Sequence, residues 1–304
     1  MPTRRSVLML VPALALTACA APRAIEAGAV KAGSTEPGAV LAGAVPTGPA
    51  PSAPGPGAHP PTGPAVPPRP SLEQVTRQFG GRSPHAWGLD VPGVVTRSGS
   101  GSVALTFDAC GGPSGAGFDQ RLIATLRKNK VPATLFLNAR WIAANPGPSA
   151  ELAADPLFEL ADHGSAHRPL SVSGRAAYGI QGTGTLAAAY EELVSNRPHL
   201  EALVARPSSW YRPGTAFYDE VSAELVRALG LVPVNFSVNG DGGATFTAVQ
   251  VATAVGGARA GDIVISHMNR PGSGTAPGYE AVLPRMLERG VTFATLSGAG
   301  ISPA

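Results

Sequence analysis

The sequence predicts an α/β domain whose parallel strands form a barrel or an open sheet. From Val103 onward, short apolar runs alternate with segments of helical character. This alternation is typical of parallel sheets, because each parallel pair of strands needs a crossover connection, usually a helix. Several apolar runs also end in an ionisable or metal-binding side chain. Folds of this class place their active sites at the carboxyl ends of the strands.

Residues 1–18 have the features of an export signal. Arg4 and Arg5 resemble the pair of a twin-arginine signal, and residues 7–18 form an apolar stretch shorter than the roughly 20 residues of a spanning helix. The stretch ends Leu16-Thr17-Ala18-Cys19, which resembles a bacterial lipoprotein cleavage box. The alternative is an ordinary signal peptide cut at a nearby site. We expect lipidation at Cys19 and an extracytoplasmic protein tethered to the membrane.

Residues 19–70 are predicted to be a disordered linker. Pro, Gly, Ala, Ser and Thr dominate this segment, which has too few large apolar side chains to offset the entropy of ordering it. Loss of Arg4 and Arg5 with the leader lowers the net charge from +3 to +1. No basic run remains, so we expect no nucleic-acid partner, and no feature indicates a protein partner.

The folded domain is expected to span residues 71–304, which is long enough for one sizeable core. Residues 71–100 are expected to be a lead-in segment that covers the barrel or its bottom. Strands are predicted at 103–107, 132–137, 158–161, 208–211, 233–238, 263–266 and 291–296. Helices are predicted at 118–130, 149–156, 185–205 with an interruption near Pro198, 219–229, 247–259 and 277–289. The connection at 170–183 is unusually long and is therefore a candidate wall of a substrate site.

Charged and metal-binding side chains follow the predicted strands. They are Asp108, His163 with His167 four residues later, Arg212, Asp241 and His267. Two imidazoles at this spacing can bind one cation, and their combination with a carboxylate suits Zn²⁺ or, less specifically, Co²⁺, Mn²⁺ or Ni²⁺. We therefore predict an active-site rim that holds a divalent metal, with zinc as the preferred ion.

Taken together, these blocks resemble the polysaccharide deacetylase family, also called the NodB-homology family or family-four carbohydrate esterases. The resemblance covers about residues 101–298. Its motifs are matched in order by Thr106-Phe107-Asp108-Ala109-Cys110-Gly111, by His163 and His167 in His-x-x-x-His, by Arg212-Pro213-Gly214-Thr215, by Asp241, and by Ile265-Ser266-His267. The resemblance implies a distorted (β/α)7 barrel and metal-dependent removal of acetyl groups from a glycan.

The predicted catalytic residues are Asp108, His267, Asp241 and Arg212. A bound ion would lower the pKa of water to about 7. Asp108 could take the water's proton, and His267 could protonate the leaving amine while Asp241 orients it. The resemblance gives Arg212 the role of steadying the catalytic acid. Candidates for stacking against sugar rings are Trp210, Tyr211 and Tyr178.

Ala109 departs from the family pattern, in which this position carries the aspartate that completes the metal triad. A methyl group cannot bind metal, so another group must substitute, or the ion binds weakly. We predict Asp108, His163 and His167 as the ligands. Cys110 is less favoured because Gly111 and Gly112 indicate that the strand does not continue that far.

The predicted function is metal-dependent removal of N-acetyl groups from a cell-wall or other extracytoplasmic polysaccharide. One alternative is an esterase that removes O-acetyl groups. Another is a glycan-binding lipoprotein that kept the barrel and lost catalysis with Ala109. The presence of Asp108, Arg212, Asp241 and His267 favours an enzyme, because binding alone does not need an acid–base set.

Overall fold

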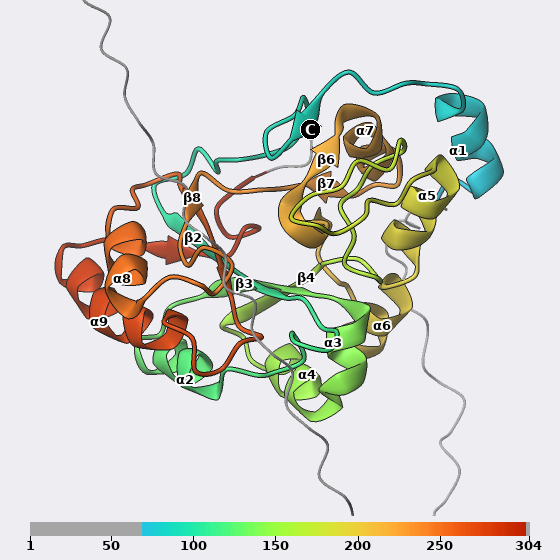
Figure 1. Ribbon diagram of the computed structural model, residues 1–304. Helices are drawn as coiled ribbons and strands as arrows, with labels where there is room; N and C mark the ends of the chain where they lie inside the picture. Colours follow the sequence, from blue (N-terminus) through green and yellow to red (C-terminus); the bar gives the residue numbers. More distant parts are fainter. Residues whose placement is uncertain (1–68, 302–304) are drawn as a thin grey trace, which may run out of the picture. The chain divides into compact units, whose positions relative to one another are not determined.

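The computed structural model describes residues 69–301 (Figure 1). The predicted leader, the lipidation site Cys19 and nearly all of the predicted linker lie outside the described residues. Within the described part of the chain, no helix is long and apolar enough to cross a membrane.

A curled parallel sheet forms the centre of the domain (Figure 1). Its strands run in the order β7-β5-β4-β3-β2-β9-β8, and β10 pairs with β2. They are β2 (Val103–Ala109), β3 (Ala133–Leu137), β4 (Phe158–Asp162), β5 (Trp210–Tyr211), β7 (Val232–Pro233), β8 (Val238–Asn239), β9 (Ile263–His267) and β10 (Phe293–Ala294). Every ladder of this sheet is parallel. Between residues 69 and 301 no ladder joins β7 to β8, so the sheet is a barrel left open there. The predicted distorted barrel of parallel strands is confirmed.

Helices cover the sheet in three groups (Figure 1). One group packs α2 (Gln120–Lys128) and α8 (Ala248–Gly256) against α9 (Thr275–Glu288). A second contains α3 (Ala139–Ala144), α4 (Pro146–Ala153) and α6 (Arg197–Leu203), near β4. The third contains α1 (Leu72–Phe79), α5 (Leu186–Val194) and α7 (Glu220–Ala228). The lead-in segment supplies α1 and also β1 (Trp87–Gly88), which pairs antiparallel with β6 (Tyr218–Asp219).

Strand β2 shows how side-chain alternation divides the core from the site. All its residues are buried. Phe107 and Ala109 belong to the apolar cluster that also holds residues of α2 and α9. Thr106 and Asp108 point the other way, because successive side chains of a strand face opposite sides of the sheet, and both contact Arg212. The strand therefore directs the Asp108 carboxylate towards Arg212 and packs Ala109 against the helices.

The structure differs from the predicted elements at several places. Helix α1 was not predicted, although Ser71 and Gln74 form a capping box at its start. Helix α3 was also not predicted; the Asn138 side chain accepts a hydrogen bond from the Arg140 amide at its start. The single strand predicted at 233–238 is two short strands, because Asn235, which lies between them, makes hydrogen bonds to Arg212 and Ala216. Its carbonyl accepts a hydrogen bond from Arg212, and its side chain donates one to the Ala216 carbonyl.

Candidate active site

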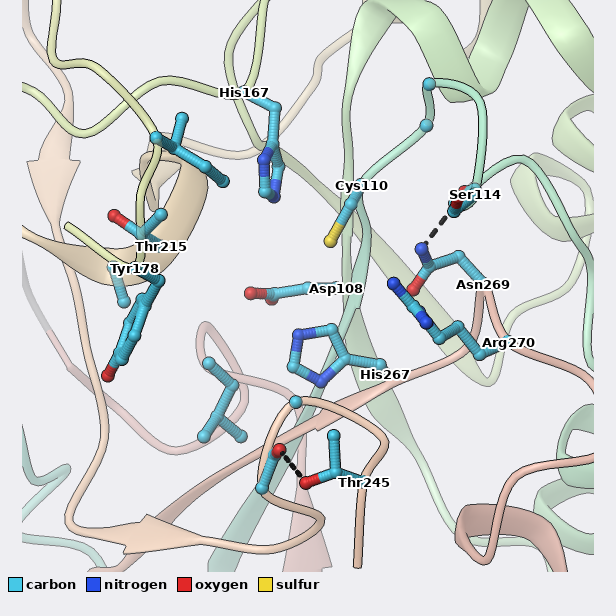
Figure 2. Close-up of a pocket in the computed structure, with 18 of the residues that line it drawn as sticks. Asp108, Cys110, Ser114, His167, Tyr178, Thr215, Thr245, His267, Asn269 and Arg270 are labelled. Carbon is cyan, nitrogen blue, oxygen red and sulfur yellow. Dashed lines mark hydrogen bonds between the residues drawn. The ribbon is translucent and has the colours of Figure 1, made fainter. Parts of the chain in front are cut away.

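A pocket of about 780 Å³ lies at the carboxyl ends of the strands (Figure 2). Asp108, Cys110, His167 and His267 point into it, and they come from three separate segments that follow or end β2, β4 and β9. Tyr178, from the long predicted loop, lines the opposite wall. Of the residues predicted for the rim, Asp108, His167 and His267 line this pocket, and Asp108 and His267 are more than 150 residues apart in sequence.

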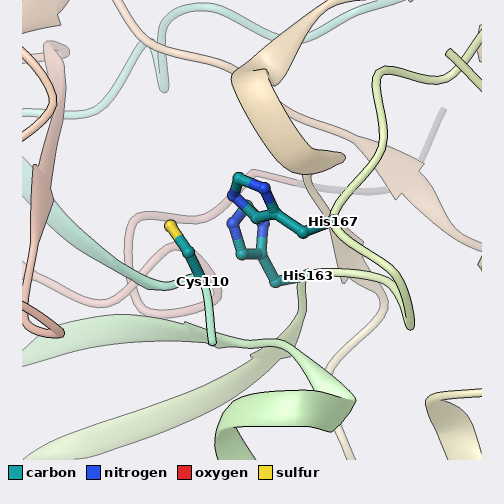
Figure 3. Close-up of side chains that lie close together, drawn as sticks. All are labelled: Cys110, His163 and His167. Carbon is teal, nitrogen blue, oxygen red and sulfur yellow. The ribbon is translucent and has the colours of Figure 1, made fainter. Parts of the chain in front are cut away.

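The ligand atoms of Cys110, His163 and His167 lie within 4.8 Å of one another (Figure 3). His163 is fully buried, and its Nδ1 lies 2.8 Å from the Arg212 carbonyl oxygen. A carbonyl can only accept a hydrogen bond, so Nδ1 carries a hydrogen, and in the neutral ring Nε2 then presents a lone pair. This Nε2 has no hydrogen-bond partner among the described residues. A buried nitrogen in that state, beside a second imidazole and a thiol, fits a metal ligand.

A buried carboxylate holds the loop that carries both histidines. Glu192 of α5 is 3% exposed and accepts hydrogen bonds from the backbone amides of Ala166 (2.9 Å) and Arg168 (3.3 Å) and from the Ser165 hydroxyl (3.0 Å). Within this loop, His167 has a φ of 59°, a left-handed backbone conformation that is uncommon for residues other than glycine. Glu192 therefore fixes the loop that places the two imidazoles 5.0 Å apart, centroid to centroid. No pattern in the sequence pointed to this residue.

Gly214, two residues after Arg212, leaves room for the loop that carries the histidines. A Cβ atom at this position would lie 2.2 Å from the backbone carbonyl of His167. The loop carrying the histidines therefore passes directly over Gly214, and only glycine leaves enough room.

Asp108 and Arg212 form a buried ion pair. Arg212 is fully buried; its Nη1 donates to Asp108 Oδ1 (2.8 Å) and to the Thr106 hydroxyl (2.9 Å), and its guanidinium lies 4.2 Å from the centroid of the Phe136 ring. Burial alone would raise the pKa of Asp108. The Arg212 guanidinium, aided by His163 and His267, outweighs burial and holds that pKa below its usual value. Asp108 is thus an ionised carboxylate, and its Oδ2 is 3.8 Å from His163 Nε2.

His267 and Asp241 form the second pair. His267 Nδ1 lies 3.0 Å from Asp241 Oδ1, and the His267 amide donates to Asp241 Oδ2 (2.7 Å). The Thr275 hydroxyl donates to the same oxygen (3.0 Å). Burial alone would lower the pKa of His267, but the Asp241 carboxylate, with a smaller contribution from Cys110, raises it well above its usual value. His267 is therefore arranged to hold a proton at the pocket.

The predicted aromatic platform is only partly correct. Tyr178 lines the pocket and is 76% exposed, and its ring is perpendicular to that of Phe217. Trp210 and Tyr211, by contrast, are buried on β5, with 3% and 0% exposure. Both belong to apolar core clusters. The prediction that these two residues stack against a sugar was wrong, because their strand lies below the rim and both its faces are covered.

The structure brings together a different set of candidate metal ligands from the one predicted. The cluster of three ligand atoms contains Cys110 rather than Asp108. Cys110 was set aside on the sequence because two glycines follow it, but β2 continues to Ala109 and Cys110 lines the pocket. The alternation of side chains along 106–110 was the signal that could have found it. Ligation by Asp108 stays a prediction.

Comparisons with known proteins agree with this architecture. Residues 96–234 match the family model of polysaccharide deacetylases. A peptidoglycan N-acetylglucosamine deacetylase aligns with a TM-score of 0.57 at 19% identity, over 69% of this chain and 94% of that one. A family 4 carbohydrate esterase from Streptomyces lividans in complex with acetate gives 0.53 at 22% identity, over 67% and 94%. A CE4 family pseudoenzyme from Bacillus anthracis gives 0.55 at 18% identity, over 68% and 69%. At these identities the likeness concerns the fold. No curated protein matches the chain.

Proposed function

Residues 96–234 belong to the polysaccharide deacetylase family, and on this premise we propose that the chain is a metal-dependent hydrolase that removes N-acetyl groups from an extracytoplasmic polysaccharide. One observation carries the proposal: an ionised carboxylate and an imidazole with a raised pKa face the same pocket. Arg212 maintains the first and Asp241 the second. A site that only binds a glycan needs neither.

The donor atoms at the pocket fit a divalent cation. His163 and His167 would hold it through ring nitrogens, and the unpartnered Nε2 of His163 is the clearest sign of such a role. A divalent ion held there supplies Lewis-acid polarisation of the acetyl carbonyl and of the attacking water. Zinc suits the imidazole ligands best, and Co²⁺, Mn²⁺ or Ni²⁺ are the other candidates.

The protein's own residues move the protons. The Asp108 carboxylate takes a proton from the attacking water as the oxygen bonds to the acetyl carbon. His267 donates its proton to the amide nitrogen as the C–N bond breaks, which gives acetate and a free amine. An amide nitrogen leaves poorly without that proton, so the raised pKa of His267 suits an N-acetyl substrate.

The substrate proposal also draws on the wall of the pocket. The exposed ring of Tyr178 offers an apolar face for a sugar ring. Among similar structures, a peptidoglycan N-acetylglucosamine deacetylase has the same fold. A cell-wall polymer with N-acetylated sugars is therefore the substrate class that we propose.

The experiment is acetate release from a panel of acetylated glycans, with the free amine measured alongside. Peptidoglycan, N-acetylated chitooligosaccharides and O-acetylated xylan serve as substrates, each with chelator and with zinc added back. Acetate together with an equal amount of amine supports the proposal. Acetate without amine identifies an O-acetyl esterase, and no acetate from a fully metal-loaded protein contradicts the proposed hydrolase. A CE4 family pseudoenzyme has the same fold.

Substitution of Asp241 by asparagine should change the pH dependence of hydrolysis. Asp241 raises the pKa of His267, so in the unaltered protein the acid form persists to high pH and activity falls as pH rises through that pKa. Asp241→Asn lowers the pKa of His267, so the alkaline limb of the pH–kcat profile should move to lower pH. At pH values above the lowered pKa, kcat should be about 10²-fold below that of the unaltered protein.

Thr275→Val is the matched control. It removes one hydrogen bond to Asp241 but leaves the carboxylate, so its alkaline limb should move little. An Asp241→Asn profile that keeps its alkaline limb in place would show that His267 is not the acid.

We also propose that Cys19 carries a lipid that tethers the domain to a membrane, on the evidence of the leader that precedes it. Cys19→Ala should stall processing or release the protein from the membrane fraction of the producing cell. The measurement is fractionation followed by mass analysis of the mature amino terminus. Unchanged fractionation and processing would contradict lipidation.

A further inference from the structure

The position that follows the catalytic carboxylate faces the core and not the pocket. Ala109 is fully buried within the apolar cluster between the sheet and the helices. An acid there would point into that cluster and away from the histidines. The next residue, Cys110, has turned back towards the pocket, in keeping with the alternation along the strand. After Asp108, the first side chain available to an ion is therefore the thiol.

The chain after Cys110 is shaped to hold the thiol in place. Gly111 has a φ of 69°, and a Cβ atom there would lie 2.6 Å from the backbone nitrogen of Trp141 in α3. The close approach of α3 thus forces the turn immediately after Cys110. The Arg140 guanidinium donates to the Cys110 carbonyl (3.2 Å) and closes the turn from the other side.

Asn138 joins the thiol-bearing segment to the histidine-bearing one. It is fully buried at the end of β3, which lies between β2 and β4 in the sheet. Its backbone amide donates to the Ala109 carbonyl (3.1 Å), and its side-chain amide donates to the His163 carbonyl (2.9 Å). One residue therefore fixes the distance between the strand ends that carry Cys110 and His163.

We propose that the thiolate of Cys110 is the third protein ligand of the metal, with His163 and His167, and that Asp108 stays off the ion as the base. This inference rests on the metal site of the proposed function. The three ligand atoms lie within 4.8 Å of one another, and the buried His163 Nε2 has no hydrogen-bond partner in the described part of the chain. Asp108, by contrast, has one oxygen bound to Arg212.

A centre with two imidazoles and one thiolate has chemical consequences. Three protein ligands leave a fourth position for water or substrate, which is the usual arrangement of catalytic zinc. Thiolate is a soft ligand, so it favours zinc over Mn²⁺ or Mg²⁺, which prefer oxygen. The proposed specificity is therefore for Zn²⁺, with Co²⁺ as a spectroscopic substitute.

Cobalt loading tests the inference with a signal that does not depend on activity. The chain has two cysteines, so a Cys19→Ser background leaves Cys110 as its only thiol. In this background, Co²⁺ should give a near-ultraviolet thiolate-to-cobalt charge-transfer band. Cys110→Ser should abolish the band and weaken zinc binding by about 10²-fold or more. Cys110→Asp should restore ion binding without the band. Ion binding by this variant would also show that the protein tolerates a substitution at position 110.

Asp108→Asn is the matched comparison. It should keep the band and full metal occupancy while hydrolysis is lost. The inference is overturned if the Cys19→Ser protein binds cobalt without the band or binds none. It is also overturned if Asp108→Asn empties the site while Cys110→Ser leaves it filled. A cysteine-dependent band in a protein that releases no acetate would support the metal centre and reject the hydrolase, so the two failures can be distinguished.

Discussion

Replacement of His163 by alanine is expected to remove the metal and abolish acetyl hydrolysis together. His163 is fully buried, its Nδ1 is bound to the Arg212 carbonyl, and its Nε2 has no partner within residues 69–301. The substitution removes this Nε2, which is aimed at the site from a fixed position. A catalytic metal supplies several kcal/mol of transition-state stabilisation, so its loss should lower kcat/KM by about 10³-fold or more.

The measurement is metal content by elemental analysis together with acetate release. His167→Ala should behave in the same way, because His167 lies in the same cluster. His199→Ala is the matched control, since His199 is exposed on α6 and does not line the pocket. Full activity of the His163→Ala protein in a metal-stripped preparation would show that hydrolysis does not use this centre.

Replacement of Arg212 by methionine should be the most destabilising of the changes considered. Arg212 and Asp108 are both buried, at 0% and 3% exposure, and the guanidinium bonds Asp108, Thr106 and the Asn235 carbonyl. Methionine leaves Asp108 as a buried carboxylate without its counter-charge, and breaking a buried pair in this way costs about 3–5 kcal/mol. The measurement is urea unfolding of the variant and the unaltered chain near pH 7.

The same substitution should also change catalysis in a defined direction. Arg212 lowers the pKa of Asp108, so the ionised base is present down to low pH in the unaltered protein. Without the guanidinium, burial raises that pKa, and the acidic limb of the pH–activity profile should move to higher pH.

Arg82→Met provides the control for the Arg212 variant. Arg82 forms an ion pair with Glu224 at the surface, with 40% and 37% of the two side chains exposed, so its loss should cost at most about 1 kcal/mol. A loss below about 1 kcal/mol for Arg212→Met would show that the buried pair has little net effect on folding.

The fold was predictable from the sequence because its signals are repeated. Continuous apolar runs such as those of β2 and β3 are buried on both faces, and β2 is followed by a helix with one apolar side. The positions of Asp108, His163 and His267 at strand ends also followed from this pattern. Asp241 was predicted to orient His267, and it does contact that ring. Arg212 was expected to steady the catalytic acid but instead bonds the Asp108 carboxylate.

The parts that were missed depend on one or two residues at a strand boundary. The sequence could not show that β2 runs to Ala109, and this decides whether position 109 or 110 faces the pocket. Trp210 and Tyr211 do lie in the predicted strand, but the sequence could not show that both side chains are covered by apolar clusters of the core. Glu192 and Asn138 were missed because each acts on backbone that is distant in the sequence.

The buried carboxylate of Glu192 has a consequence for how the protein would survive without its ion. Because Glu192 holds the histidine loop through three protein hydrogen-bond donors, the loop's conformation is fixed by the fold itself. Small zinc domains, by contrast, unfold when a chelator removes the metal. Here the empty protein should keep its shape and stability, so that an ion could leave and return repeatedly without refolding. Such a protein can complete its folding first and acquire its metal afterwards.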